Sequence, residues 1–181
     1  FRSQEKGHAF LLDVIRTVPG IGLTFVGDGP FRASIEQRVQ SEGLSDRVRF
    51  TGLLPRDRVY EELAAADLLV SPSLREGLPI AVLEAMAVGK PVLLSDIPPH
   101  REVCRGIPVP LLPQDRDIWA TKIAWYASRS PASLRAEGLA NRQNVEEAFT
   151  LRRMHDEYSR LYDALLNGLG NGNGRTAVER V

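Results

Sequence analysis

The sequence of 181 residues is 43% hydrophobic and 25% charged, which is typical of a soluble globular protein with one well-buried core. Lys and Arg together number 23, as do Asp and Glu, so net charge does not favour nucleic acid as a partner. The single cysteine, Cys104, excludes an internal disulfide, and three unclustered histidines give no metal site of recognisable spacing. We expect no bound metal and a reducing compartment.

No apolar run approaches the roughly twenty residues that cross a bilayer, and no signal peptide precedes the first predicted strand. We therefore expect a cytoplasmic protein, with membrane contact limited to peripheral association at the inner face. The sequence begins at Phe1 rather than at a methionine, which indicates an interior piece of a larger chain.

Helical and strand patterns alternate along the first two thirds of the sequence. Hydrophobic spacing predicts helices over 8–18, 31–40, 58–66 and 80–89, and strands over 23–26, 48–50, 67–70 and 91–94. A loop is expected over 95–102, and prolines allow 109–112 to be an edge strand or an extended loop. Because the strands are continuously apolar, the pattern predicts an α/β fold, a Rossmann-like doubly wound parallel sheet with helices on both faces.

The last third is predicted to be helical up to a short tail. Helices are expected over 117–128 and 131–148, and Thr150 is a plausible N-cap for a final helix with an apolar stripe from Leu151 to Leu165. From Asn167 the sequence becomes rich in Gly and Asn, so we expect a flexible tail over 167–181.

The segment 71–94 contains an unusual helix, opened by Pro79 and ended near Gly89. Its residues are almost all apolar, so we expect the helix to be buried all round. Glu84 is its single charge, and an unpaired buried carboxylate costs several kcal/mol, so it requires a partner. That partner is either a ligand or an internal cation such as Arg101.

Three further sites accompany Glu84. Gly77 and Pro79 leave Glu76 in the loop before the helix, so both carboxylates can face the strand ends where parallel sheets bind ligands; otherwise Glu76 is an exposed loop acid. Gly27-Asp28-Gly29 follows a strand and precedes a helix, which favours either an anion site or a plain tight turn. With Arg32 in place of a third glycine, it does not match a dehydrogenase fingerprint. Lys6 precedes the first helix and is either a phosphate ligand or a solvated lysine.

Residues 76–92, Glu76-Gly-Leu-Pro-Ile-Ala-Val-Leu-Glu84-Ala-Met-Ala-Val-Gly-Lys-Pro-Val, resemble the E-x7-E region of retaining glycosyltransferases of family 4, which have the GT-B architecture. Segments 25–30, 48–52, 66–72 and 95–98 resemble that family in order and spacing, and the similarity covers about 6–166. The resemblance implies a nucleotide-sugar donor-binding domain over 1–166, without a metal cofactor, acting in retaining transfer of a hexosyl-type group.

The resemblance also implies a role for each site residue. Lys6 and Glu76 would be the catalytic residues: Lys6 would neutralise the diphosphate, and Glu76 would hold a hydroxyl of the donor sugar. Glu84 would accept hydrogen bonds from the ribose. The remaining donor-binding residues implied are Gly27, Asp28, Gly29, Leu53, Gly77, Leu78, Pro79 and Ile80.

Compared with the family, the sequence lacks a first strand ending in Gly-Arg and the N-terminal acceptor domain. We therefore expect this piece to bind a nucleoside diphosphate weakly without turnover, and to have low stability or to form an oligomer through the exposed sheet. The alternatives are a GT-B nucleotide-sugar epimerase or phosphorylase, and a non-catalytic binding or assembly module with the same fold. For the epimerase, no constellation of an acid and a histidine supports the assignment.

Overall fold

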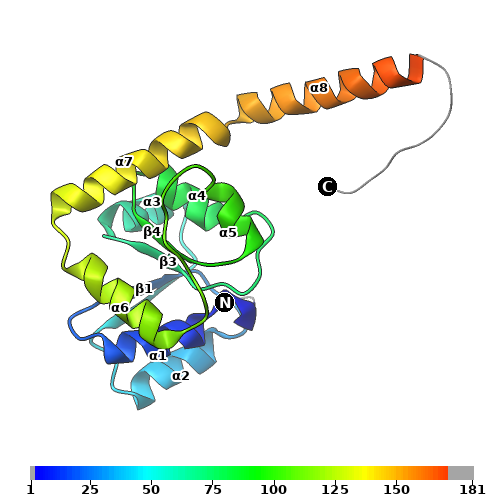
Figure 1. The fold of residues 1–181 in the computed structure, drawn as a ribbon. Coiled ribbons are helices and arrows are strands. Elements are labelled where there is room, and N and C mark those ends of the chain that lie inside the picture. The colour runs from blue at the N-terminus through cyan, green and yellow to red at the C-terminus, as the bar shows by residue number, and fades with distance from the viewer. Residues whose placement is uncertain (1–2, 171–181) are drawn as a thin grey trace. The chain divides into compact units, whose positions relative to one another are not determined.

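The computed structural model describes residues 3–170, and its contacts divide the chain into two compact units, Phe1–Val145 and Glu146–Val181. The first unit alternates helices and short strands (Figure 1). Its elements are the 3-10 helix η1 (Gln4–Lys6), α1 (His8–Thr17), β1 (Leu23–Val26), α2 (Arg32–Ser41), β2 (Val48–Gly52), α3 (Arg56–Ala65), β3 (Leu69–Ser71), α4 (Ile80–Ala87), β4 (Val92–Ser95), α5 (Pro98–Val103), β5 (Leu111–Leu112), α6 (Arg116–Ala127) and α7 (Pro131–Ala148), which continues past the end of the unit.

All pairings between these strands are parallel, and helices lie on both faces (Figure 1), which confirms the predicted fold class. The strands form two sheets, β1-β2 and β3-β4-β5, rather than the single sheet expected from the sequence. Leu23 is opposite Val48 in the first sheet, and Leu69 is opposite Val92 in the second. β1 and β3 are thus both edge strands among the residues described.

The core lies between the first sheet and helices α1, α2 and α6. The inner face of α1 is buried, with Leu12 and Val14 fully inaccessible. Trp119 of α6 is equally buried: its ring packs edge-on against Phe10, and its indole N–H donates to the Pro113 carbonyl at 2.8 Å. This bond satisfies the one polar atom of the largest core side chain.

Two local predictions were wrong. α4 is not buried all round: Val82, Ala85 and Met86 form its buried face, while Ile80 is 59% exposed. Residues 95–102, expected to be a loop, include α5, which begins with two prolines in its first turn. Proline is tolerated there because the first N–H groups of a helix have no intrahelical partner.

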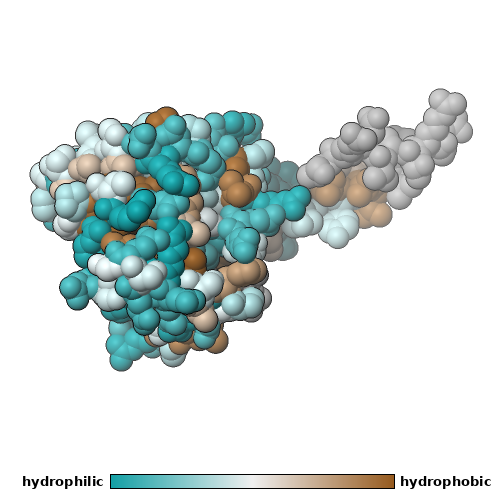
Figure 2. All heavy atoms as spheres, turned by 90° about the horizontal axis from the view of Figure 1, so that it is seen from below, coloured by the Kyte–Doolittle hydropathy of each residue, from teal (hydrophilic) through white to brown (hydrophobic). Residues whose placement is uncertain are grey.

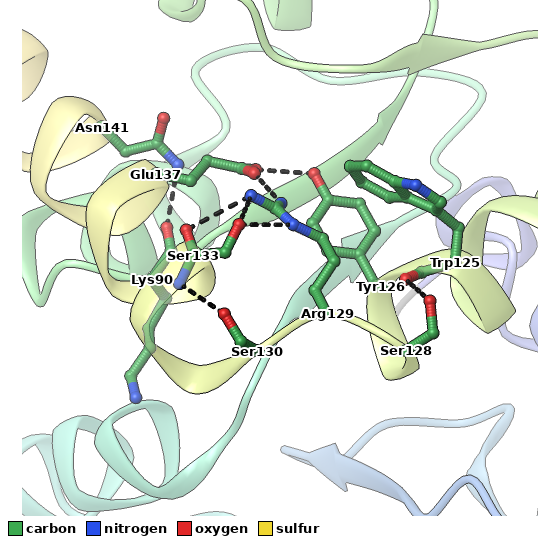
Figure 3. A network of polar contacts seen from close by, with 9 residues as sticks. All are labelled: Lys90, Trp125, Tyr126, Ser128, Arg129, Ser130, Ser133, Glu137 and Asn141. Carbon is green, nitrogen blue, oxygen red and sulfur yellow. Dashed lines mark hydrogen bonds and ion pairs between the residues drawn. The ribbon is translucent and has the colours of Figure 1, made fainter.

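The start of α7 is held to α6 by a network of polar contacts (Figure 3). Glu137 accepts hydrogen bonds from the Tyr126 hydroxyl at 2.6 Å and from the Arg129 guanidinium, which also lies over the Trp125 ring. Burial and, to a smaller extent, the hydrogen bond to Glu137 raise the pKa of the Tyr126 hydroxyl. The phenol therefore stays protonated and donates this hydrogen bond. This network fixes the turn between the two helices.

Farther along, α7 packs closely on the end of α4. A Cβ atom built on Gly138 would lie 1.8 Å from the Gly89 carbonyl oxygen, so only glycine fits there. One turn later the Asn141 side chain donates to the Lys90 carbonyl at 2.9 Å, and Asn144 donates to the Val103 carbonyl at the same distance. These bonds satisfy backbone groups at the ends of α4 and α5.

The second unit is dominated by α8 (Leu151–Gly170). The Arg153 N–H donates to the Thr150 hydroxyl at 3.2 Å, as expected for the predicted N-cap. The apolar stripe is present and exposed, with Leu161 at 54%. α8 extends to Gly170, so the tail predicted from Asn167 is helical over its first four residues, and residues 171–181 lie outside the part described. Within that part, no helix is both long and apolar enough to span a bilayer.

Candidate functional site

A cleft of about 1460 Å³ runs along β1 and β3 and reaches the carboxyl ends of both strands. Its lining includes Lys6, Glu76 and Glu84, together with Gly27 and Asp28 from the loop after β1. Residues up to 78 positions apart in the sequence thus meet at the edge where parallel sheets bind ligands. Beyond the cleft, hydrophobic residues reach the surface in separate patches among hydrophilic ones on the face drawn in Figure 2.

Lys6 and Glu76 form an ion pair at this cleft, with 2.6 Å between Nζ and Oε2. The Lys6 side chain is 43% exposed and that of Glu76 only 9%. η1 holds Lys6 in place, because the Leu74 N–H donates to the Glu5 carbonyl at 2.7 Å. Gly7 adopts φ 73° directly against Pro72, where a Cβ would lie 2.6 Å from the carbonyl oxygen. The sequence therefore places one cation at a fixed point beside a nearly buried carboxylate.

Glu84 lies on α4 with 23% of its side chain exposed. Its Oε1 is 3.4 Å from the Tyr60 hydroxyl and 3.8 Å from the Arg56 guanidinium, both on α3. The internal partner considered from the sequence, Arg101, instead makes a bidentate pair with Asp96 at 2.5 and 2.9 Å. Among the described residues, Glu84 therefore has only long contacts, and it keeps acceptor capacity toward the cleft.

The first turns of two helices also contribute to this cleft, which is lined by His8 of α1 and Ala81 of α4. α1 begins after Gly7 and α4 after Pro79, and neither N-cap residue makes a side-chain hydrogen bond to its helix. The first N–H groups of a helix carry partial positive charge and bind anions when no side chain caps them. Together with Lys6, these helix starts favour a ligand with negatively charged groups.

The Gly27-Asp28-Gly29 loop has a local role as well as a place in the cleft wall. Gly27 has φ 115°, and its N–H donates to the Gly52 carbonyl at 2.9 Å. Asp28 accepts a hydrogen bond from the Gly29 N–H at 2.7 Å and lies 3.6 Å from the Arg32 guanidinium. The tight-turn interpretation of this loop accounts for these contacts, and only Gly27 and Asp28 are among the residues that line the cleft.

The remaining predicted binding residues are divided between the cleft and its surroundings. Leu53 lines the cleft and is 79% exposed. Four others are not in the lining, namely Gly77, Leu78, Pro79 and Ile80. Pro79 is buried, while Leu78 is 62% exposed. A role for these four in binding a ligand remains a prediction.

Sequence reasoning missed several residues of this region. His8, the first residue of α1, lines the cleft and packs edge-on against Phe25. Tyr60 contacts Glu84 from α3, four residues after Arg56 on the same helix face. The sequence contained two weak signals for these residues. His8 is two positions from Lys6, and Arg56 and Tyr60 have the four-residue spacing of one helix face.

His100 is fully buried below the loop that contains Glu76. Its Nδ1 donates to the Ser95 carbonyl at 2.9 Å, and the Ser95 hydroxyl donates to the Ser73 carbonyl. Among the described residues no group bonds to Nε2. Burial lowers the pKa of His100, so the ring is neutral and supports this loop without adding charge.

Stability should fall as pH decreases from 6.5 toward 4. Burial lowers the pKa of His8 to about 4, with a further contribution from Lys6, and also lowers the pKa of His100. Below 6.5 the unfolded chain then binds more protons than the folded chain, so the free energy of unfolding decreases. Urea unfolding between pH 7.5 and 5, where most carboxylates stay ionised, measures this slope.

Exposed His155 provides the control for that measurement, since its side chain is 79% accessible. His155→Gln should leave the slope unchanged, whereas His8→Gln should reduce it. A wild-type stability that stays constant or rises as pH falls through this window would contradict the assignment of both buried histidines.

A family model described as glycosyl transferases group 1 matches residues 2–106, more than half of the sequence. The chain belongs to this family. Putative glycosyltransferase EpsF of Bacillus subtilis (strain 168) is 33% identical over 170 residues, 91% of this chain and 41% of that protein. The 2-deoxystreptamine N-acetyl-D-glucosaminyltransferase of Streptomyces fradiae is 47% identical over 74 residues, 41% of this chain and 18% of that enzyme.

Solved structures share the fold of this glycosyl transferases group 1 chain. Sucrose-phosphate synthase from Thermosynechococcus elongatus is 27% identical with a TM-score of 0.80, covering 92% of this chain and 44% of that one. Anabaena HepE, solved in complex with UDP and glucose, is 22% identical with a TM-score of 0.79, covering 91% and 47%. The GT-B fold inferred from the sequence is thereby confirmed, and the chain spans less than half the length of these relatives.

Proposed function

We propose that this chain binds a nucleotide-diphosphate sugar and forms the donor half of a retaining, hexosyltransferase-type glycosyltransferase. The proposal rests on one observation. Lys6, Glu76 and Glu84 line one cleft, next to the first turns of α1 and α4, whose N-cap residues make no side-chain cap. A nucleotide sugar has anionic phosphates and many hydroxyl donors. For the phosphates, the cleft offers the Lys6 cation and backbone N–H groups at helix starts. For the hydroxyl donors, it offers the carboxylates of Glu76 and Glu84 as acceptors.

Each side chain has a role that its surroundings support. Lys6 and the start of α1 neutralise the diphosphate. Glu84, whose contacts to Tyr60 and Arg56 are long, accepts from the two ribose hydroxyls. Glu76, paired with Lys6, accepts from a hydroxyl of the donor sugar.

Transfer breaks the bond between the sugar carbon and the diphosphate oxygen, so negative charge grows on the departing diphosphate. Groups already fixed beside that oxygen stabilise the transition state more than the ground state. Lys6 meets this requirement because η1 and Gly7 hold it in place. Glu76 and Glu84 act in donor binding rather than as the acid and nucleophile of a hydrolase, which accords with the pairing of Glu76 to Lys6.

The acceptor is bound by a second domain in the complete protein. Apolar side chains around the cleft support this part of the proposal, because Leu53, Leu74 and Leu78 are 57–79% exposed. Three large leucines near one site form a surface that a neighbouring domain can bury. Retention of the anomeric configuration is tested by NMR of the product formed by the complete enzyme.

Nucleotide titration of the Glu84→Gln variant tests the donor site. A hydrogen bond to a charged acceptor contributes about 1.5–3 kcal/mol, so loss of the charge should raise the Kd for UDP or UDP-glucose about tenfold to a hundredfold. UDP is the first nucleotide to use because HepE and the pneumococcal O-GlcNAc transferase GtfA were solved with it. Isothermal titration calorimetry of wild type and variant gives the ratio.

Glu61→Gln is the matched control, since Glu61 is on α3, pairs with Arg58 and is 60% exposed. It should bind nucleotide as the wild type does. If neither UDP nor GDP binds the wild-type chain, or if Glu84→Gln binds as tightly as Glu61→Gln, the chain is a binding or assembly module that has kept the fold.

A further inference from the structure

Tyr60 links α3 to the carboxylate of Glu84. Arg56 and Tyr60 lie four residues apart on one face of α3, which packs beside α4 (Figure 1). The Arg56 Nε–H donates to the Tyr60 hydroxyl oxygen at 2.9 Å, and the guanidinium lies over the Tyr60 ring. Because this oxygen already accepts from Arg56, the hydroxyl hydrogen is available to Glu84 Oε1, 3.4 Å away. Tyr60 is therefore the donor in its contact with Glu84.

The geometry of this contact leaves Glu84 able to bind a ligand. Tyr60 and Arg56 both approach Oε1, and a carboxylate oxygen has two lone pairs. Oε1 can thus accept from Tyr60 and from a ligand at the same time, while Oε2 accepts independently. The Glu84 side chain is partly exposed and lines the cleft. Tyr60 consequently orients the carboxylate and leaves it acceptors for a ligand.

Two contacts at its last turn hold α3 in position. Lys90, which follows α4, donates from Nζ to the Ala64 carbonyl at 2.6 Å. Arg49 of β2 donates to the Glu62 carboxylate at 3.0 Å. The end of α3 is thus attached to two neighbouring segments, and Tyr60 lies close to that end with its side chain half-buried. The Tyr60 hydroxyl is therefore fixed before a ligand binds.

The orientation of Glu84 affects ligand binding because a glutamate side chain has several rotatable bonds. A free glutamate loses rotamer freedom when a ligand immobilises it, and this loss opposes binding. A carboxylate that Tyr60 already orients loses less freedom. Two ribose hydroxyls require both carboxylate oxygens in one orientation, whereas a single hydroxyl can be met in several. The advantage is therefore largest for a ligand that has both hydroxyls.

We propose that Tyr60 positions Glu84 for bidentate binding of a ribose, and thereby determines how strongly the cleft prefers ribonucleotides to 2′-deoxyribonucleotides. The inference rests on the proposed function, in which Glu84 accepts from both ribose hydroxyls. Tyr60 is a positioning residue, because it acts through Glu84 and does not need to touch the nucleotide. Arg56 acts through Tyr60, since a phenol that accepts from a guanidinium is a stronger donor.

Isothermal titration calorimetry of this chain with UDP and with 2′-deoxy-UDP tests the proposal. The wild type should bind UDP about tenfold more tightly than the deoxy form, which lacks one hydrogen bond to a charged acceptor. Tyr60→Phe removes only the hydroxyl. We expect it to weaken UDP binding about threefold to tenfold and to reduce the preference for UDP about threefold. The matched control is Tyr158→Phe on α8, an exposed tyrosine, which should leave both affinities unchanged.

A double-mutant cycle separates positioning from a purely structural role. In the Glu84→Ala background, Tyr60→Phe should change the Kd for UDP less than about twofold, whereas a general loss of structure would add to the effect of Glu84→Ala. An unchanged preference in Tyr60→Phe, equal weakening of both nucleotides, or additive effects in the cycle would overturn the inference. In each of those cases, weaker binding of UDP by Glu84→Gln would still support the proposed function, whereas a wild type that binds neither nucleotide would overturn both.

Discussion

Replacing Gly138 by alanine should destabilise the first unit by about 3 kcal/mol or more. The added Cβ would lie 1.8 Å from the Gly89 carbonyl oxygen and 3.2 Å from the Lys90 nitrogen. Both are backbone atoms at the end of α4, so the contact is relieved only by moving α7 or α4. Alanine would favour the helix by about 1 kcal/mol, which is too little to offset the clash.

Urea unfolding followed by circular dichroism measures this effect. Gly22→Ala is the control: its Cβ would meet only the Arg47 carbonyl oxygen, at 3.9 Å. We expect that variant to change the free energy of unfolding by less than about 1 kcal/mol. A Gly138→Ala variant as stable as Gly22→Ala would show that α7 does not require this close approach.

Lys6→Ala should reduce kcat of the complete enzyme by about a hundredfold to a thousandfold, the effect of removing one fixed donor to a developing anion. The same substitution should weaken binding of UDP to this chain. Lys122→Ala provides the control, because Lys122 lies over the Trp125 ring on α6. Unchanged transfer by Lys6→Ala would exclude Lys6 from the reaction.

Glu76→Gln should distinguish binding of the donor sugar from binding of the nucleoside diphosphate. The substitution removes the partner of Lys6, which is then free to meet phosphate, so UDP should bind at least as tightly as to the wild type. UDP-glucose should lose affinity relative to UDP, because a neutral amide is a weaker acceptor for the sugar hydroxyl. Equal losses for both ligands would assign Glu76 to the phosphate side of the cleft instead.

Much of the fold was predictable because the hydrophobic pattern is local. The continuously apolar strands and the α1 stripe indicated parallel pairing and a buried helix face, and both are present. Local patterns do not determine which strand edges meet, so the split between the β1-β2 and β3-β4-β5 sheets was missed. α5 was missed because Pro98 and Pro99 resemble a loop, although both fit a first turn.

The candidate site could likewise be predicted only where its signal is local in the sequence. Glu84 was identifiable as a single charge on an apolar helix, but its contacts with Tyr60 and Arg56 arise from the packing of α3 on α4. The pairing of Lys6 with Glu76 joins residues 70 positions apart, and no spacing rule predicts it. His100 gave no signal because its role is to support backbone at Ser95 from within the protein.

The Lys6–Glu76 contact has a consequence for turnover. In the proposed function, one cation serves two anions in succession: it pairs with Glu76 when the cleft is free, and with the diphosphate when the donor is bound. After transfer, the sugar no longer occupies Glu76, and this carboxylate competes with the spent nucleotide for Lys6. The ion pair would thus accelerate product release, and Glu76→Gln should make UDP a stronger product inhibitor.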